Sequence, residues 1–209
     1  MVSYKCRKPD PDKVRAIKEL QPHKTKEDVI SVLCLVVFYH EFIKNMSELT
    51  TLIQKLMEKN VLFEWSTEQQ KAFETLKNRI SEKSCLTFPE REWYYELDKH
   101  VSLNGIGAAL FQKDPSVRLF TIEFVSKVLS KAQKKQDIPV LEFCSIVLGL
   151  KKFECYVHDA HVDIFTDHYG LQNMMKNNPP AQIQRWWWDI ADHDFDIYYK
   201  KGKQTSQIP

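Results

Sequence analysis

The sequence predicts an α/β fold, with helices in the first part of the chain and strands mixed with helices in the second. The main observation is the stretch from Arg91 to Gln112, which has the pattern of a strand, a tight turn and a second strand. Tyr95 and Leu97 alternate onto one face of the first strand, and Asn104-Gly105 is a hairpin turn signal. The second observation is the order of the patterns that follow: strand, helix, strand, helix, strand.

The first part of the chain carries helical patterns with recognisable starts. A short helix is expected from Asp12 to Leu20. Thr25 and Asp28 form a capping box for a helix that runs to about Ile43, and Ser47 is expected to cap a helix over residues 48–58. A further capping box, Ser66 with Gln69, opens a helix whose apolar stripe faces the core through Phe73, Leu76 and Ile80.

After the hairpin, the predicted helix over residues 138–157 is apolar on almost every side, which indicates burial. Trp186 and Ile190 lie at helical spacing, so we expect them in the core rather than stacked on nucleic-acid bases. The predicted strands of this part are Leu119–Val125, His161–Thr166 and Phe195–Tyr199.

Bulk properties narrow the class of protein. A length of 209 residues suits one or two domains, and a net charge of +2 does not by itself indicate a nucleic-acid partner. The five cysteines contain no C-x-x-C pair, which argues against a disulfide scaffold or a zinc site and favours a reducing compartment. The longest apolar stretch, Val29–Phe38, is too short to span a membrane, and no signal peptide is recognised. We therefore expect an intracellular protein, cytoplasmic or nuclear.

The hairpin resembles the opening hairpin of the ribonuclease H domain in gypsy-class LTR retrotransposon polyproteins. The residues that match this pattern are Ser102, Gly105, Ile106, Gly107, Ala108, Leu110 and Gln112. The resemblance implies a ribonuclease H-like mixed five-stranded sheet with flanking helices. It runs from about Pro9 to Lys203.

The first part resembles the segment that follows the polymerase palm in these polyproteins. Pro-Asp-Pro-Asp-Lys-Val-Arg-Ala-Ile, from Pro9, and Phe-Glu-Trp-Ser, from Phe63, carry this resemblance. It implies three regions: a thumb-like helical region of a reverse transcriptase over 1–60, a connection helix over 61–84 and the ribonuclease H-like domain over 85–209. No Tyr-x-Asp-Asp polymerase motif occurs, so the chain lacks a polymerase palm.

The resemblance also implies a catalytic site. In the family, four carboxylates hold two Mg²⁺ ions that cut the RNA strand of an RNA–DNA hybrid. Glu142 and Asp167 stand at two of these positions and are the expected metal ligands. The first acidic position falls on His100, a poor Mg²⁺ ligand, with Asp98 as the nearest substitute on the same strand face. The sequence ends at Pro209, before the Asp that is the fourth ligand in the family.

Possible partners follow from the same resemblance. They are an RNA–DNA hybrid or other nucleic acid, contacted by the basic turn of Lys200, Lys201 and Lys203, and the palm, fingers or integrase parts of a polyprotein. Three hypotheses stay open: an active ribonuclease H that uses Asp98, a non-cleaving fragment that binds nucleic acid through its backbone, and a structural or interaction remnant. We expect cleavage to be impaired or lost.

Overall fold

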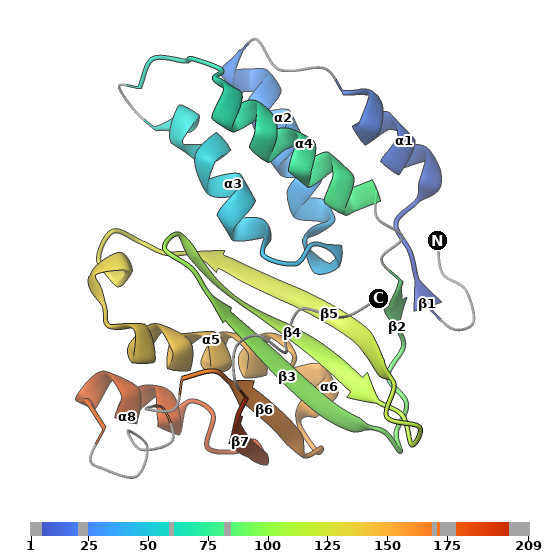
Figure 1. The fold of residues 1–209 in the computed structure, drawn as a ribbon, viewed down its shortest axis with the longest axis vertical. Helices are drawn as coiled ribbons and strands as arrows, with labels where there is room; N and C mark the ends of the chain where they lie inside the picture. The colour runs from blue at the N-terminus through green and yellow to red at the C-terminus, as the bar shows by residue number, and fades with distance from the viewer. Residues whose placement is uncertain are drawn as a thin grey trace.

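The computed structural model describes residues 6–20, 25–58, 61–81, 85–168, 171 and 179–200. Figure 1 shows a central sheet with one group of helices on each side. The first group consists of α1 (Pro11–Glu19), α2 (Lys26–Phe38), α3 (Met46–Gln54) and α4 (Thr67–Ser81), with the 3-10 turns η1 (His40–Phe42) and η2 (Lys55–Met57). The second consists of η3 (Gln133–Lys135), α5 (Ile138–Lys152), α6 (Glu154–Val157) and α8 (Ala181–Trp188).

The sheet has five strands in the order β5-β4-β3-β6-β7. Antiparallel pairing joins β3 to β4 and β4 to β5, whereas β3 pairs with β6, and β6 with β7, in parallel. The predicted mixed five-stranded sheet with flanking helices is therefore confirmed. Its strands are β3 (Tyr94–Val101), β4 (Gly105–Lys113), β5 (Leu119–Val128), β6 (Val162–Thr166) and β7 (Phe195–Tyr199).

Helix α5 packs against the middle of the sheet. Phe143 and Leu150 are fully buried there against Leu97 of β3, as the apolar sequence pattern predicts. A Cβ at Gly149 would meet Ala108 Cβ and Leu97 Cδ1 at 2.8 Å, so only glycine permits this approach of helix to sheet. The prediction of one helix through Val157 is wrong, because the backbone leaves helical geometry at Phe153 and α6 starts anew.

The helical group has its own apolar cluster, built from Val29, Ile43, Phe73 and Ile80 among others. The capping box of Thr25 with Asp28 is confirmed. Two boundaries differ from prediction. The second helix ends at Phe38 and is followed by η1, and Ser47 lies inside α3, whose N-cap is Asn45 in the left-handed conformation (φ 56°). The division into regions 1–60, 61–84 and 85–209 stays a prediction.

The start of α3 lies against the hairpin of β4 with β5. The Ser47 N–H donates to Ser126 Oγ at 3.0 Å. A Cβ at Gly105 would collide with Ser47 Oγ and would lie 3.1 Å from the Lys127 carbonyl oxygen. The absence of a side chain at Gly105 thus permits the close approach of the helical group to the sheet, and Gly105 also forms part of the hairpin turn.

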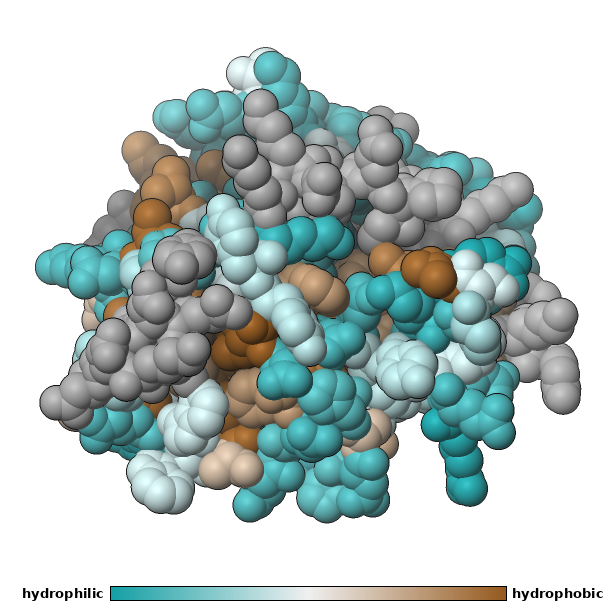
Figure 2. Space-filling view, turned by 60° about the horizontal axis from the view of Figure 1, so that its bottom comes forward, coloured by the Kyte–Doolittle hydropathy of each residue, from teal (hydrophilic) through white to brown (hydrophobic). Residues whose placement is uncertain are grey.

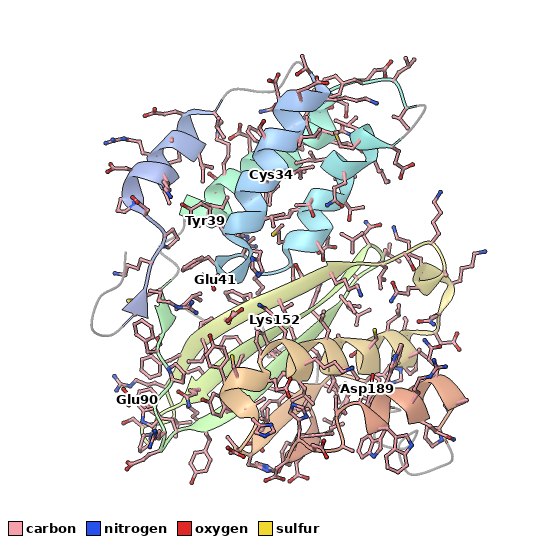
Figure 3. The ribbon with its side chains drawn as sticks, turned by 180° about the vertical axis from the view of Figure 1, so that it is seen from behind. Cys34, Tyr39, Glu41, Glu90, Lys152 and Asp189 are labelled. Carbon is pink, nitrogen blue, oxygen red and sulfur yellow. A yellow bond between two sulfur atoms is a disulfide. The ribbon has the colours of Figure 1, made fainter. Side chains whose placement is uncertain are left out.

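An ion-pair network also joins the two parts. Arg7 lies 3.2 Å from Glu41 of η1 and 4.0 Å from the buried Glu123 of β5. Glu123 also accepts a hydrogen bond from Tyr156 Oη at 3.0 Å and lies 3.4 Å from Lys152 Nζ. Burial, with the Glu123 charge, raises the pKa of Tyr156 to about 12. Figure 3 shows Glu41 on the sheet-facing end of the helical group and Lys152 on the far side of β5.

Near the network, Cys6 and Cys85 form a disulfide between β1 (Cys6–Arg7) and β2 (Leu86–Thr87), which pair antiparallel. The prediction that the cysteines form no disulfide is therefore wrong for Cys6 and Cys85. These two residues are 79 positions apart in the sequence and meet only in the folded chain. Cys34, Cys144 and Cys155 are free thiols.

The view in Figure 2, turned so that the bottom of Figure 1 comes forward, shows mostly hydrophilic side chains around a smaller apolar area. Trp188, at the end of α8, is 77% exposed, whereas Ile190 is fully buried and Trp186 packs against the core, as predicted for the last two. Within the described ranges, no helix has the length and apolarity that a membrane span requires.

The β6–β7 pairing places two like charges side by side, because Asp163 is the register partner of Asp196. His161 lies between them and a third carboxylate. Its Nδ1 is 3.1 Å from Asp194, and its Nε2 is 3.5 Å from Asp163 and 3.7 Å from Asp196. The hydrogen bond to Asp194 is the main reason that the pKa of His161 is raised above 6.5. Protonated His161 therefore offsets the repulsion at this end of the sheet.

We predict that Gly105→Ala lowers the free energy of unfolding by about 1–3 kcal/mol, because the added methyl group overpacks the contact with Ser47 and the Lys127 carbonyl. Urea denaturation measures the change. Leu103→Ala is the matched control, since this side chain in the same turn is 89% exposed and its loss is expected to change stability by less than about 0.5 kcal/mol. Equal denaturation midpoints for both variants would contradict the interface described here.

We also predict a pH-dependent contribution from His161. Its pKa is higher in the folded chain, so the contribution is fully present below the unfolded value of 6.5 and is lost as pH rises through the folded value. Thermal melts of wild type and His161→Gln should therefore differ most below pH 6.5 and converge at higher pH. A difference that grows with rising pH would exclude this assignment.

Candidate active site

A pocket of about 320 Å³ lies at the carboxyl ends of the parallel strands β3 and β6. It is bounded by the first turn of α5 on one side and by the segment between η1 and α3 on the other. The four residues singled out as catalytic or as the altered catalytic position all line it. Its polar lining consists of Lys44, Asn45, Asp98, Lys99, His100, Glu142, Thr166, Asp167 and Lys200.

Strand register explains why these residues meet. Tyr95 pairs with Val162 and Leu97 with Ile164, and the pairing ends at Asp98 with Phe165. The same offset, carried two residues beyond the last pair, brings His100 level with Asp167. The equal spacing of the apolar residues before His100 and Asp167 is thus matched by the pairing. That the two strands aim His100 and Asp167 at a common ion stays a prediction.

The two faces of β3 point to different surroundings. Asp98 and His100 face the helical group, where His100 Nε2 lies 3.8 Å from Glu48 of α3 and the charge of Lys44 acts on both residues. Lys99 points to the opposite face and reaches α5. Asp98 shares the face of His100, as predicted, but it is Lys99 that contacts the two other carboxylates.

Lys99 lies between Glu142 and Asp167. Its side chain is 4% exposed, its Nζ is 2.5 Å from Asp167 Oδ1, and it also contacts Glu142 Oε2. Glu142 is similarly buried, whereas Asp167 is half-exposed. A lysine ammonium has three donors and no acceptor, so one buried cation serves both carboxylates. Lys99 is not among the predicted site residues, and its sequence position indicates only that it alternates onto the face of Leu97, toward α5.

The ionisation of the pocket follows from burial and from these neighbours. Burial lowers the pKa of Lys99, and the hydrogen bond with Asp167 opposes that effect and lowers the pKa of Asp167. Burial raises the pKa of Asp98 despite the nearby Lys44 and Lys200 charges, and burial lowers the pKa of His100, which favours the neutral imidazole.

This set of residues does not fit a pair of Mg²⁺ ions. Mg²⁺ prefers hard anionic oxygens, but the two carboxylates at family positions, Glu142 and Asp167, both bind an ammonium. His100, which the sequence analysis expects at the first ligand position, offers an imidazole nitrogen, and Mg²⁺ prefers oxygen ligands. In the described part of the chain, no group of three or more His, Cys, Asp or Glu side chains is arranged to hold a metal ion.

Of the predicted basic turn, only Lys200 falls within the described residues. It lines the pocket, its N–H donates to the Thr166 carbonyl at 2.8 Å, and its Nζ lies 5.0 Å from the centre of the Phe165 ring. Lys201 and Lys203 lie outside the described residues. Lys44 and Asn45, from the helical group, are pocket residues that the sequence did not indicate.

Comparison with known proteins gives a consistent picture. Residues 65–164 match the family described as an RNase H-like domain found in reverse transcriptase. The chain is 29% identical to the retrovirus-related Pol polyprotein from transposon gypsy of Drosophila melanogaster, over 98% of this chain and 21% of that protein. It is 24% identical to the transposon Tf2-3 polyprotein of Schizosaccharomyces pombe, over 96% of this chain and 16% of that protein. The chain thus spans about a fifth of these relatives.

Solved structures share the fold at low sequence identity. The foamy viral protease-reverse transcriptase dRH in complex with double-stranded DNA superposes with a TM-score of 0.76 and 14% identity, over all of this chain and 39% of that one. The foamy viral protease-reverse transcriptase in complex with an RNA/DNA hybrid gives a TM-score of 0.74 and 15% identity, over 96% of this chain and 28% of that one. The ribonuclease H-like fold expected from the sequence is confirmed.

We predict that Lys99→Met lowers the free energy of unfolding by about 3 kcal/mol at pH 7, because Glu142 is left buried without its cation. Lys151→Met is the matched control, since Lys151 forms a half-exposed ion pair with Asp189 (2.7 Å; Asp189 is labelled in Figure 3) that is expected to contribute less than about 1 kcal/mol. Denaturant titration of both variants gives the comparison. Similar small losses in the two would show that Lys99 is not a buried counter-ion.

Proposed function

We propose that this chain, which is similar to the gypsy-class retrotransposon polyproteins and matches an RNase H-like domain over residues 65–164, is a non-cleaving module that holds nucleic acid by the phosphate backbone. The observation that carries the proposal is the ammonium of Lys99, which occupies the two carboxylates that metal-dependent cleavage would require. The fold is retained while this part of the chemistry is altered.

Positive charges at the pocket support a role in binding a phosphate backbone. Lys44 and Lys200 line it from opposite parts of the chain. Lysines that neutralise phosphates give affinity without sequence preference, and this affinity falls as salt rises. Structurally similar foamy viral enzymes are described in complex with double-stranded DNA and with an RNA/DNA hybrid. We propose that Lys201 and Lys203 of the basic turn contact the phosphate backbone in the same way.

The similar proteins are long polyproteins, which supports the proposal that this chain acts as one part of a larger protein. Under this proposal residues 1–60 act as a thumb-like region and 61–84 as a connection helix, and further polyprotein parts, such as palm, fingers or integrase, are the protein partners. The Arg7 network and the Ser47–Ser126 hydrogen bond hold the helical group against the sheet, which would present both to one nucleic acid. The proposed compartment is intracellular, cytoplasmic or nuclear.

We predict that the chain binds a labelled RNA–DNA hybrid without cutting it in Mg²⁺ or Mn²⁺. Affinity should fall at least tenfold between 50 and 200 mM salt, since about three phosphate contacts suffice for that change. Lys44→Gln and Lys200→Gln should each weaken binding and reduce the salt slope by about one. Filter binding and gel analysis of the RNA strand measure both properties.

Lys151→Gln is the control, because this lysine pairs with Asp189 away from the pocket. Wild-type cleavage that disappears in Glu142→Gln would overturn the non-cleaving assignment. Absence of binding even at low salt would leave a structural or interaction role in its place.

A further inference from the structure

We propose that Lys99 is a built-in cation that closes this site to divalent metals, and that removing its charge converts the pocket into a site for one divalent ion of the Mg²⁺ or Mn²⁺ type. The ligands of that ion would be Glu142 and Asp167, with Asp98 and His100 on the pocket wall beside them. The inference goes beyond nucleic-acid binding, and it holds whether or not the chain binds a hybrid.

The geometry of the three charged groups resembles coordination of a cation by converging oxygens. Lys99 comes from β3, Glu142 from the first turns of α5, and Asp167 from the end of β6. Lys99 Nζ contacts both carboxylates, at 2.5 Å in the case of Asp167 Oδ1. Carboxylate oxygens from two separate elements, α5 and the end of β6, therefore already converge on one positive charge, the Lys99 ammonium.

The backbone fixes the ammonium in that place. Strand alternation puts Lys99 on the face of Leu97, which is fully buried under α5. The register of Leu97 with Ile164 sets Lys99 level with Thr166, one residue before Asp167. With 4% of its side chain exposed, Lys99 is buried between the two carboxylates. The cation is therefore supplied by the strand itself.

Charge explains why the lysine and a metal exclude each other. Glu142 and Asp167 supply two negative charges, and Lys99 already balances one of them. A divalent ion at the same place would meet the ammonium at close range and would find the oxygen lone pairs engaged. Without the ammonium, the carboxylates of Glu142 and Asp167 converge on a position with no positive charge, and carboxylate oxygens are ligands that Mn²⁺ accepts.

The test is a titration of the purified chain with Mn²⁺ alone, followed by electron paramagnetic resonance and by thermal denaturation. Any Mn²⁺ binding by wild type should be independent of Glu142. Wild type and Glu142→Gln should therefore give the same Mn²⁺ titration curve. Lys99→Met and Lys99→Gln should each gain one Mn²⁺ per chain with at least tenfold higher affinity than wild type. Their melting temperatures should rise in saturating Mn²⁺, because the ion binds only the folded chain.

Three controls separate this result from general charge effects. Lys99→Arg keeps the cation and should gain nothing. Lys151→Met removes a lysine from a single carboxylate and should also gain nothing. Adding Glu142→Gln to Lys99→Met should abolish the gain. If Lys99→Met folds only in the presence of Mn²⁺, that outcome supports the proposal.

Two results would overturn the inference. One is wild-type Mn²⁺ binding that is lost in Glu142→Gln, which would mean that the lysine does not exclude the metal. The other is failure of both neutral Lys99 variants, folded or not, to gain Mn²⁺ affinity. Neither result involves nucleic acid, so both are distinguishable from failure of the proposed binding function.

Discussion

The parallel pairing of β3 with β6 is the constraint on which the site depends. Apolar residues fix its register, because Leu97 and Ile164 pair with each other and both are buried against α5. A slip of one residue would turn these side chains away from the core, so the register is strongly specified. The strand ends are thereby level, and the close approach at Gly149 brings the first turns of α5, with Glu142, to the same place.

The Lys99 side chain determines which cation the carboxylates of this pocket bind. Converging carboxylates are costly to bury and need a positive partner, which can be a metal ion or an ammonium. In this chain the partner is Lys99, held by the strand itself rather than taken from solution. Packing of the sheet against α5 therefore does not require an exchangeable ion.

The features that the sequence predicted are those that depend on local residue patterns and on the family resemblance. Strand alternation and the matched spacing before His100 and Asp167 anticipated the pocket, and the apolar pattern of α5 anticipated its burial. Lys99 escaped prediction because a lysine beside a strand end has the same local pattern whether it is solvated or buried. Lys44 and the Cys6–Cys85 disulfide escaped for another reason: each depends on segments distant in sequence that meet only in the folded chain.

The most direct test of this account is anomalous diffraction from crystals of the wild-type chain grown in Mn²⁺. Lys99 acting as the resident cation predicts continuous density from Lys99 Nζ to the carboxylates of Glu142 and Asp167, and no anomalous peak at coordination distance from either one. An anomalous peak between the two carboxylates, with the Lys99 side chain displaced, would contradict the account and would restore the pocket as a metal site.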